Sequence, residues 1–236
     1  MLRMTWSSLK QQNQSQWVRS SYLWLFLVPV VANALSSMPQ TASLEFGGGQ
    51  FNLTLALPFS WKLFYCGSVC FSFAGFIYLL ACPLLVRSFE GYSQYIDVGR
   101  GSRPVIDYYL HQKHHEYFRT PKPNRKLGHF VAFKHFIKDF TTGDNDWRGV
   151  DCSILRDDSL SETEQEIVIA TGTRKAGGTP LEIIPEKFPE AFWTARNAAD
   201  ESWPKLRGLC TTLYIIGYVL FLWVAFEGFI SVYRML

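Results

Sequence analysis

The sequence predicts a membrane protein of mainly α-helical fold, in which three transmembrane helices carry an α+β cytoplasmic domain inserted between helices 2 and 3. Three segments, residues 22–35, 63–86 and 209–230, carry almost no charge. The polar block at residues 88–207 instead holds 17 of the 23 Lys and Arg residues and 18 of the 20 Asp and Glu residues. Because a helix needs about 20 apolar residues to cross a hydrocarbon core of ~30 Å, the second and third segments are long enough to span a membrane.

The first segment is shorter and contains Pro29 and Asn33. A basic stretch, an apolar run and the small residues around Asn33 are also typical of a signal peptide, but we expect a retained helix. The predicted order is a cytoplasmic N-terminal segment (1–19), transmembrane helix 1 (20–38), an extracytoplasmic loop (39–60), transmembrane helix 2 (61–87), the cytoplasmic domain (88–207), transmembrane helix 3 (208–232) and an extracytoplasmic tail (233–236).

Basic residues predict the orientation, because cytoplasmic loops carry an excess of Lys and Arg. Three basic residues and no acid precede the first apolar segment, and three arginines follow the second. The loop between these segments carries one acid, Glu45, with Lys62 at its edge. We therefore expect a multi-pass protein of the inner membrane, with its N-terminus and middle domain in the cytoplasm. The basic residues are Arg3, Lys10 and Arg19, and then Arg87, Arg100 and Arg103.

The extracytoplasmic loop has a pattern typical of a β-hairpin. Apolar and polar residues alternate over 42–46 and over 51–55, and glycines fill the stretch between them. A lone hairpin is only marginally stable, so we expect it to lean on neighbouring subunits or on the membrane surface. A flexible loop is the alternative.

Small residues recur at four-residue spacing along the second membrane helix. Such a stripe lets transmembrane helices approach closely, which favours a homo-oligomer. Packing against the other two helices of the same chain is the alternative. The predicted helix-packing residues are Cys66, Gly67, Cys70, Ala74 and Gly75.

Glu227 is the acid of the third apolar segment. An ionisable residue inside a membrane is a functional candidate, here for transport or gating. Its position near the C-terminus offers a second interpretation, in which it lies at the interface and pairs with Arg234.

The middle domain has segregated charge. Seven basic residues and one acid, Glu116, lie between His111 and Lys138, and residues 139–166 then hold nine acids and two arginines. The basic run predicts a surface for anionic lipids or for a soluble protein partner, whereas nucleic acid would be reached only through that partner. The predicted binding residues are Lys113, Arg119, Lys122, Arg125, Lys126, Lys134 and Lys138.

Segment 102–119 reads as a helix that places three potential metal ligands, Asp107, His111 and His115, at intervals of four residues. Histidines four apart on a helix can share a metal ion, with the carboxylate as a third ligand. The order does not match a known metal motif, so a solvated or lipid-facing basic surface is the alternative. We expect no cofactor.

Segment 128–140 predicts an amphipathic helix with a phenylalanine face. That face suits either the headgroup boundary of an anionic membrane or the core of the domain. Farther along, 167–169 and 181–184 read as two strands of a hairpin, and 189–207 as a last amphipathic helix.

The layout as a whole resembles the membrane subunit of the Kiwa anti-phage defence system. The basic start (Arg3, Lys10, Arg19), the few membrane helices and the cytoplasmic middle block carry the resemblance, and no specific motif does. It implies a homo-oligomer in the bacterial inner membrane that works with a separate cytoplasmic, DNA-binding partner.

We therefore expect a non-enzymatic, oligomeric membrane sensor or scaffold that docks a soluble cytoplasmic protein. Two alternatives stay open. One is a metal-dependent, membrane-bound enzyme using His111 and His115, and the other is a pore-forming effector in which Glu227 and Asn33 supply polarity within the membrane.

Overall fold

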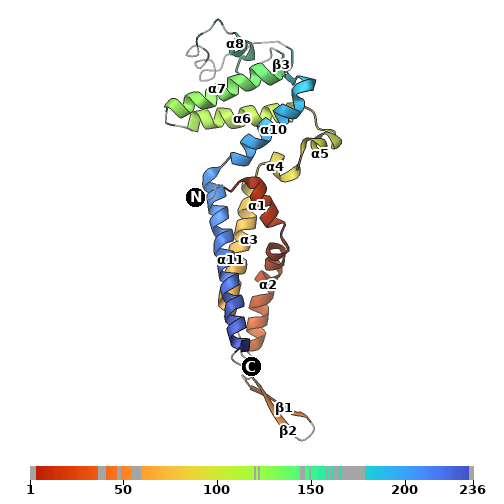
Figure 1. The fold of residues 1–236 in the computed structure, drawn as a ribbon, viewed down its shortest axis with the longest axis vertical. Helices are drawn as coiled ribbons and strands as arrows, with labels where there is room; N and C mark the ends of the chain where they lie inside the picture. The colour runs from red at the N-terminus through yellow and green to blue at the C-terminus, as the bar shows by residue number, and fades with distance from the viewer. Residues whose placement is uncertain are drawn as a thin grey trace. The chain divides into compact units, whose positions relative to one another are not determined.

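The computed structural model describes residues 4–36, 41–46, 49–54, 60–119, 121, 123–143, 147–148, 150–157, 159, 161, 165 and 179–233, most of them helical (Figure 1). The chain divides into two compact units. We call Met1–Cys82 together with Trp203–Leu236 the helical unit, and Pro83–Ser202 the insert unit. The boundaries of the insert unit lie close to those predicted for the middle domain.

The helical unit is built around two long helices that pack on each other, α3 (Trp61–Ala81) and α11 (Pro204–Tyr233). Both are long and apolar enough to cross a membrane. They match the second and third predicted transmembrane helices. A helix, α2 (Gln16–Ser36), is also present at the first predicted position, but it is not among the candidate spans found in the described residues. Arg19 and Asn33 make it less apolar.

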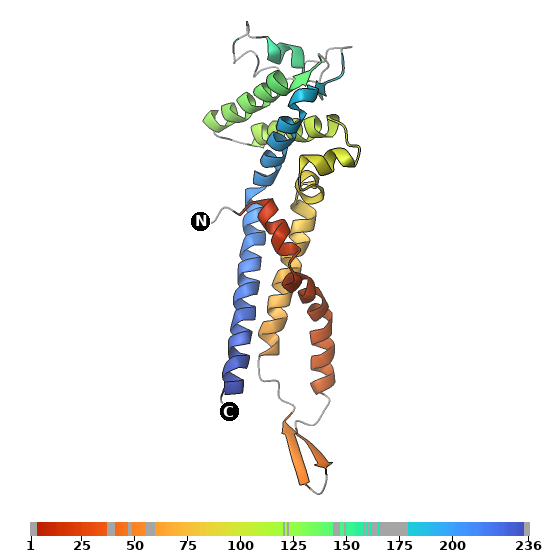
Figure 2. The ribbon, with the colours of Figure 1, turned by 45° about the vertical axis from the view of Figure 1, so that its right-hand side comes forward.

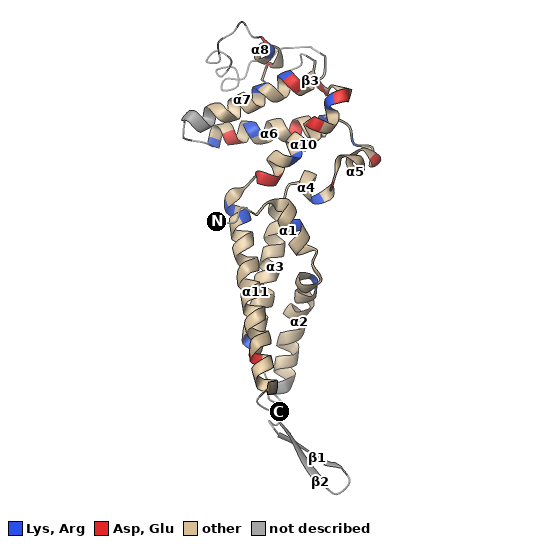
Figure 3. Cartoon of the chain, in the orientation of Figure 1, with Lys and Arg blue, Asp and Glu red and all other residues tan. Residues whose placement is uncertain are grey.

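The outer surfaces of α3 and α11 are apolar, and so is the interface between the two helices. Figure 3 shows few charged residues on these helices and many on the insert unit. A soluble bundle would place its large apolar side chains inside, whereas here many face outward. The most exposed include Phe73, Phe76, Leu80, Val219, Leu222, Phe226 and Phe229.

α3 and α11 meet through glycines that lie beneath aromatic rings. A Cβ added to Gly67 would lie 2.7 Å from the Phe221 ring, and one added to Gly217 would lie 2.9 Å from the Phe71 ring. The two phenylalanine rings contact each other edge to face at 5.3 Å between centroids. Since Gly67 faces Phe221 and Phe71 faces Gly217, the helices run antiparallel.

The N-terminal segment is folded into a helix, α1 (Trp6–Asn13), which packs on α3 (Figure 2). Thr5 caps it by accepting a hydrogen bond from the Ser8 amide at 3.3 Å. Trp6 and Leu9 are fully buried, and the Trp6 ring contacts Tyr78. Because α2 runs through residues 19 and 20, the predicted boundary between them does not coincide with the end of a helix.

The predicted hairpin is present. β1 (Thr41–Phe46) and β2 (Gly49–Thr54) pair antiparallel, with Thr41 opposite Thr54 and Phe46 opposite Gly49. Alternation and the glycine-rich link were sufficient to predict this element.

The insert unit is mainly helical. Over its described residues the paired strands form a ladder of two residue pairs, so the structure does not show the predicted α+β class. Its elements are α4 (Leu84–Ser88), α5 (Tyr92–Asp97), α6 (Arg103–Arg119), α7 (Pro123–Phe140), β3 (Thr141–Thr142), α8 (Cys152–Arg156), β4 (Glu182–Ile183), the 3₁₀ turn η1 (Pro185–Lys187) and α10 (Phe188–Glu201).

The helices of the insert unit follow the predicted pattern, whereas the predicted strand at 167–169 lies outside the described residues. α6 matches segment 102–119, and α7 begins five residues before segment 128–140. α10 ends before the predicted 207, because the chain breaks at Ser202–Trp203 and α11 begins with Pro204, a residue favoured in a first helical turn. Thr141 pairs with Ile183, and residues 166–178 lie outside the described residues.

The phenylalanine face of α7 packs into the core of the insert unit, so its placement at the headgroup boundary is wrong. Phe136 stacks on Tyr109 of α6 with 4.1 Å between ring centroids, and Phe133 contacts Trp147. The face is at most 1% exposed at Phe130, Phe133, Phe136 and Ile137. Burial of these apolar side chains stabilises the packing of α6 against α7.

Candidate functional site

The candidate site of the insert unit lies where α6 meets a tight turn at Trp147–Val150. The backbone amides and carbonyls of Trp147 and Val150 bond reciprocally at 2.9 Å. Arg148 within the turn has φ +50°, a left-handed conformation that costs energy for a residue with a side chain. The turn is held because Trp147 is buried between the rings of His114 and Phe133.

Two polar contacts fix the turn to α6. The Trp147 indole N–H donates to Asp107 Oδ1 at 3.0 Å, and Arg148 Nη1 donates to His111 Nδ1 at 3.0 Å. The Arg148 guanidinium also lies 5.4 Å from the Trp147 ring, within the range of a cation–π contact. Because a guanidinium only donates, His111 Nδ1 must accept, which requires a neutral ring with its proton on Nε2.

The electrostatics of the turn favour neutral histidines. Partial burial lowers the pKa of His111, and the positive charges of Arg148 and His115 lower it further. Burial also lowers the pKa of His114, with smaller contributions from His111, Arg148 and His115. A positive charge on either ring would face the guanidinium at short range.

The three candidate metal ligands are not brought together. Asp107 turns toward Trp147, and the rings of His111 and His115 are 6.5 Å apart between centroids. Among the residues that the structure describes, no group of three or more His, Cys, Asp or Glu side chains can hold a metal ion. The arrangement instead presents an exposed guanidinium beside exposed imidazoles, which suits a carboxylate or phosphate group.

The predicted basic residues divide into different environments. Lys113 pairs with Glu116 at 3.0 Å, and His129 Nδ1 lies 3.2 Å from the same carboxylate. Lys113 therefore belongs to a contact between α6 and α7. Arg119 and Lys138 are exposed, and Lys134 is half-buried. The side chains of Lys122, Arg125 and Lys126 lie outside the described part of the chain.

Three of the five predicted packing residues make contacts inside this chain. Gly67 faces Phe221, and a Cβ on Gly75 would clash with the Tyr22 hydroxyl of α2. Ala74 is fully buried, with its carbonyl accepting from the Cys210 thiol. Cys66 is exposed and Cys70 half-buried. Thus the same-chain alternative accounts for Gly67, Ala74 and Gly75.

Glu227 acts as a cap. Its Oε2 accepts from the backbone amide of Ser60, the residue before α3, at 3.1 Å. Its Oε1 accepts from the Trp223 indole at 2.8 Å. A carboxylate at this position satisfies an amide at the helix start and complements the positive end of the helix dipole. Arg234, its predicted partner, lies outside the described residues.

A second polar cluster was not anticipated from the sequence. Asn13 Oδ1 accepts from the hydroxyls of Tyr22 at 3.2 Å and Tyr214 at 3.1 Å. Gln12 Oε1 accepts from the Tyr218 hydroxyl at 2.8 Å. Tyr214 and Tyr218 lie four residues apart in an apolar helix, which was the available signal.

The described residues thus contain an exposed cationic site on the insert unit and a polar cluster inside the helical unit. No protein-family model matches the sequence, and no curated protein or solved structure is significantly similar to it.

Proposed function

We propose that the protein is a membrane-anchored scaffold or sensor whose helical unit holds the insert unit at the inner face of the membrane. One observation carries this proposal. The two longest apolar helices turn large apolar side chains outward, while most of the charged residues lie in a separately packed unit. Contact between such a surface and lipid tails costs little free energy, whereas contact with water is unfavourable.

The proposal includes three membrane crossings, with α1 and α2 together forming the first. α1 and α2 both pack on α3, and the hairpin follows α2 before the chain returns through α3. Arg3 before α1, and Arg87, Arg100 and Arg103 after α3, support a cytoplasmic N-terminus and insert unit.

The insert unit, on this proposal, docks a soluble partner through the cationic site at Arg148. An acidic surface fits this site, because the Arg148 guanidinium retains donors beyond the one bonded to His111. Self-association, contact with anionic lipids and a role in anti-phage defence belong to the same proposal. The role in defence is supported by the resemblance of the layout alone, and a co-transcribed gene for a DNA-binding protein would add to it.

Membrane anchoring is tested by washing membranes with alkaline carbonate and by labelling lysines in sealed vesicles with an impermeant reagent. The full chain should stay in the pellet. Lys138 should react only in inverted vesicles, and Lys62 only in right-side-out vesicles. Release by carbonate contradicts the anchoring, and reaction of Lys138 in right-side-out vesicles contradicts the orientation.

Partner docking is tested by a photo-crosslinker at the exposed Phe118, next to the cationic site. Wild type should give a discrete crosslinked species in cells, and Arg148→Glu should lose it. Arg100→Glu, which changes an exposed arginine elsewhere in the insert unit, is the matched control and should keep it. An unchanged pattern in Arg148→Glu contradicts docking at this site.

A further inference from the structure

The break between α1 and α2 lies against the middle of the apolar helices. α1 ends at Asn13 and α2 begins at Gln16. The break is anchored by the hydrogen bonds from Tyr214 and Tyr218 to Asn13 and Gln12. Tyr218 is nine residues into the apolar run that starts at Leu209, which is about 13 Å along the helix. That distance approaches half of a hydrocarbon core of ~30 Å.

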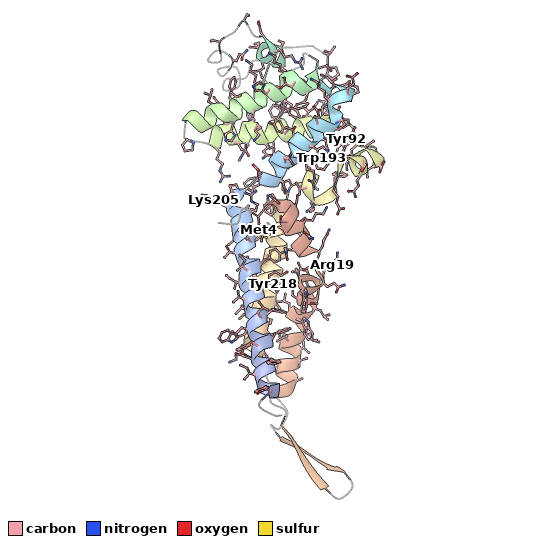
Figure 4. All side chains as sticks on the ribbon, in the orientation of Figure 1. Met4, Arg19, Tyr92, Trp193, Lys205 and Tyr218 are labelled. Carbon is pink, nitrogen blue, oxygen red and sulfur yellow. The ribbon has the colours of Figure 1, made fainter. Side chains whose placement is uncertain are left out.

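Arg19 follows this break by one turn of α2. Its backbone amide bonds to Ser15, and its side chain is exposed. The guanidinium has no hydrogen bond or ion pair with any part of the chain that the structure describes. Figure 4 shows the side chain extending outward from α2, away from Tyr218.

Arg19 is a charged residue with polar neighbours on one side only, in a helical unit whose surface is mainly apolar. Gln16, three residues before Arg19 on α2, is exposed, and so is Gln14 in the break. Apolar side chains are exposed on both sides of Arg19 along the chain, Trp17 before it and Leu23, Phe26 and Val30 after it. Charged residues within a membrane are rare, and they almost always face other protein groups or a water-filled cavity. The exposed guanidinium of Arg19, with Gln16 next to it, is therefore unsuited to lipid tails.

A second copy of the chain does not supply an acid for Arg19. Outside the insert unit the sequence has two acids, Glu45 in the hairpin and Glu227. Glu227 bonds to Ser60 at the start of α3, whereas Asn13 and Tyr22 meet α3 near Gly75, four turns later. An ion pair at the depth of Arg19 thus requires a different chain.

We propose that the α1–α2 break is a docking face for a transmembrane helix of another protein, with Arg19 pairing with an Asp or Glu near the middle of that helix. The inference rests on the proposed membrane anchoring. The exposed Gln16 next to Arg19 supplies further hydrogen bonds to the same helix, as polar side chains do between membrane helices. This gives the scaffold a partner within the bilayer in addition to the soluble one.

The probe for this docking face is a pair of synthetic Leu/Ala transmembrane peptides that differ in one central residue, Asp or Leu. The full chain, labelled at its N-terminus, is reconstituted in phosphatidylcholine vesicles, and energy transfer to each labelled peptide is measured. Wild type should bind the Asp peptide about tenfold more tightly than the Leu peptide. Arg19→Leu should abolish this preference, and Arg19→Lys should keep part of it.

Lys62→Leu is the matched control, because it removes an exposed cation from the same unit at the other end of α3. It should preserve the preference for Asp. Equal binding of both peptides by wild type overturns the inference. A preference that disappears when phosphatidylglycerol replaces phosphatidylcholine assigns Arg19 to anionic lipid headgroups and also overturns it.

Carbonate extraction of the same samples separates the two proposals. Chains that stay in the membrane without a preference for Asp contradict only the docking face. Chains that leave the membrane contradict the anchoring itself. Arg19→Leu should still give a monodisperse, helical protein, since leucine is favourable in a membrane helix.

Discussion

Gly67 and Gly217 fix the distance between α3 and α11, because each lies beneath a phenylalanine of the other helix. The reciprocal arrangement leaves no room for a methyl group at either position. Gly228 lies on the same helix as Gly217, but a Cβ there would meet nothing within 4 Å. Alanine substitutions at Gly217 and Gly228 therefore distinguish the effect of close helix packing from the effect of helix propensity.

Gly217→Ala should destabilise the helical unit by about 1–3 kcal/mol, because the Phe71 ring must move to admit a methyl group. Gly228→Ala should be neutral or slightly stabilising, because alanine favours the helix and meets no neighbour. Thermal unfolding in detergent micelles measures both variants. Equal stability of the two would show that the close approach is absent.

Protonation of His114 should weaken the turn at Trp147. Because folding lowers the pKa of His111 and His114 below the usual 6.5, the unfolded chain binds protons first as the pH falls. Their contribution to stability is fully present above pH 6.5 and is lost as the pH falls below that value. His114→Phe keeps an aromatic ring between Trp147 and Phe118 and should lose less stability between pH 7.5 and 5.5.

His135→Gln is the control for this profile, since His135 is exposed and pairs with Asp139 at 3.6 Å, away from the turn. It should follow the wild-type profile in thermal unfolding. A His114→Phe profile that coincides with wild type would place the pH dependence in other groups.

The partners of the histidine site were beyond sequence analysis. Helical spacing correctly put Asp107, His111 and His115 on one helix. However, the residues that decide their chemistry, Trp147 and Arg148, are 40 and 37 residues away from their partners. A turn in a left-handed conformation brings them there, and no periodic pattern reports such a contact.

The start of α3 depends on a residue of another helix. Ser60 makes no side-chain capping bond, and Glu227 of α11 accepts its amide instead. This contact explains an acid within an apolar helix without a role in conduction. It also joins the two long helices, at the start of α3 and near the end of α11.

Glu227→Leu should destabilise the first turn of α3 by about 1 kcal/mol, because an amide loses its acceptor and the helix dipole loses a charge. Glu227→Gln keeps an acceptor and should lose less. Hydrogen exchange at Ser60–Phe64 measures the effect, with Lys62→Gln as the control for a general change of charge. Unchanged exchange in Glu227→Leu would rule out a capping role.

Strong periodicity predicted the elements well, and weak or distant signals did not. α6, α7 and α10 carry apolar stripes at helical spacing and were found. α1 was missed because only Trp6 and Leu9 mark its buried face in a Gln- and Ser-rich stretch. The partner of β4 was missed because Thr141 and Ile183 are far apart in sequence, and a local hairpin is the simpler expectation.

The insert unit has a complete core of its own. Its buried cluster runs from Leu85 to Ala195 and draws on α4, α5, α6, α7, α8 and α10. Since a core of this kind does not require the apolar helices, the unit meets the physical criterion of a domain.

A fragment of residues 83–202 should therefore fold without detergent. Cooperative thermal unfolding and dispersed amide resonances would demonstrate this, and the fragment should remain in the supernatant after ultracentrifugation. The full chain, whose α3 and α11 expose large apolar side chains, should need detergent under the same conditions. An aggregated or non-cooperative fragment would show that the two units fold only together.

The antiparallel pairing of α3 with α11 has an evolutionary consequence. The Cys210 thiol bonds to the Ala74 carbonyl, so the end of α3 and the beginning of α11 are neighbours. The segment that joins α3 to α11 must therefore have its two ends close together, as a surface loop does. Surface loops with such closely spaced ends are where whole domains are gained or exchanged most readily. An unrelated domain inserted between Cys82 and Trp203 should thus leave the packing of α3 on α11 unaltered. The two helices could therefore carry different domains in different proteins.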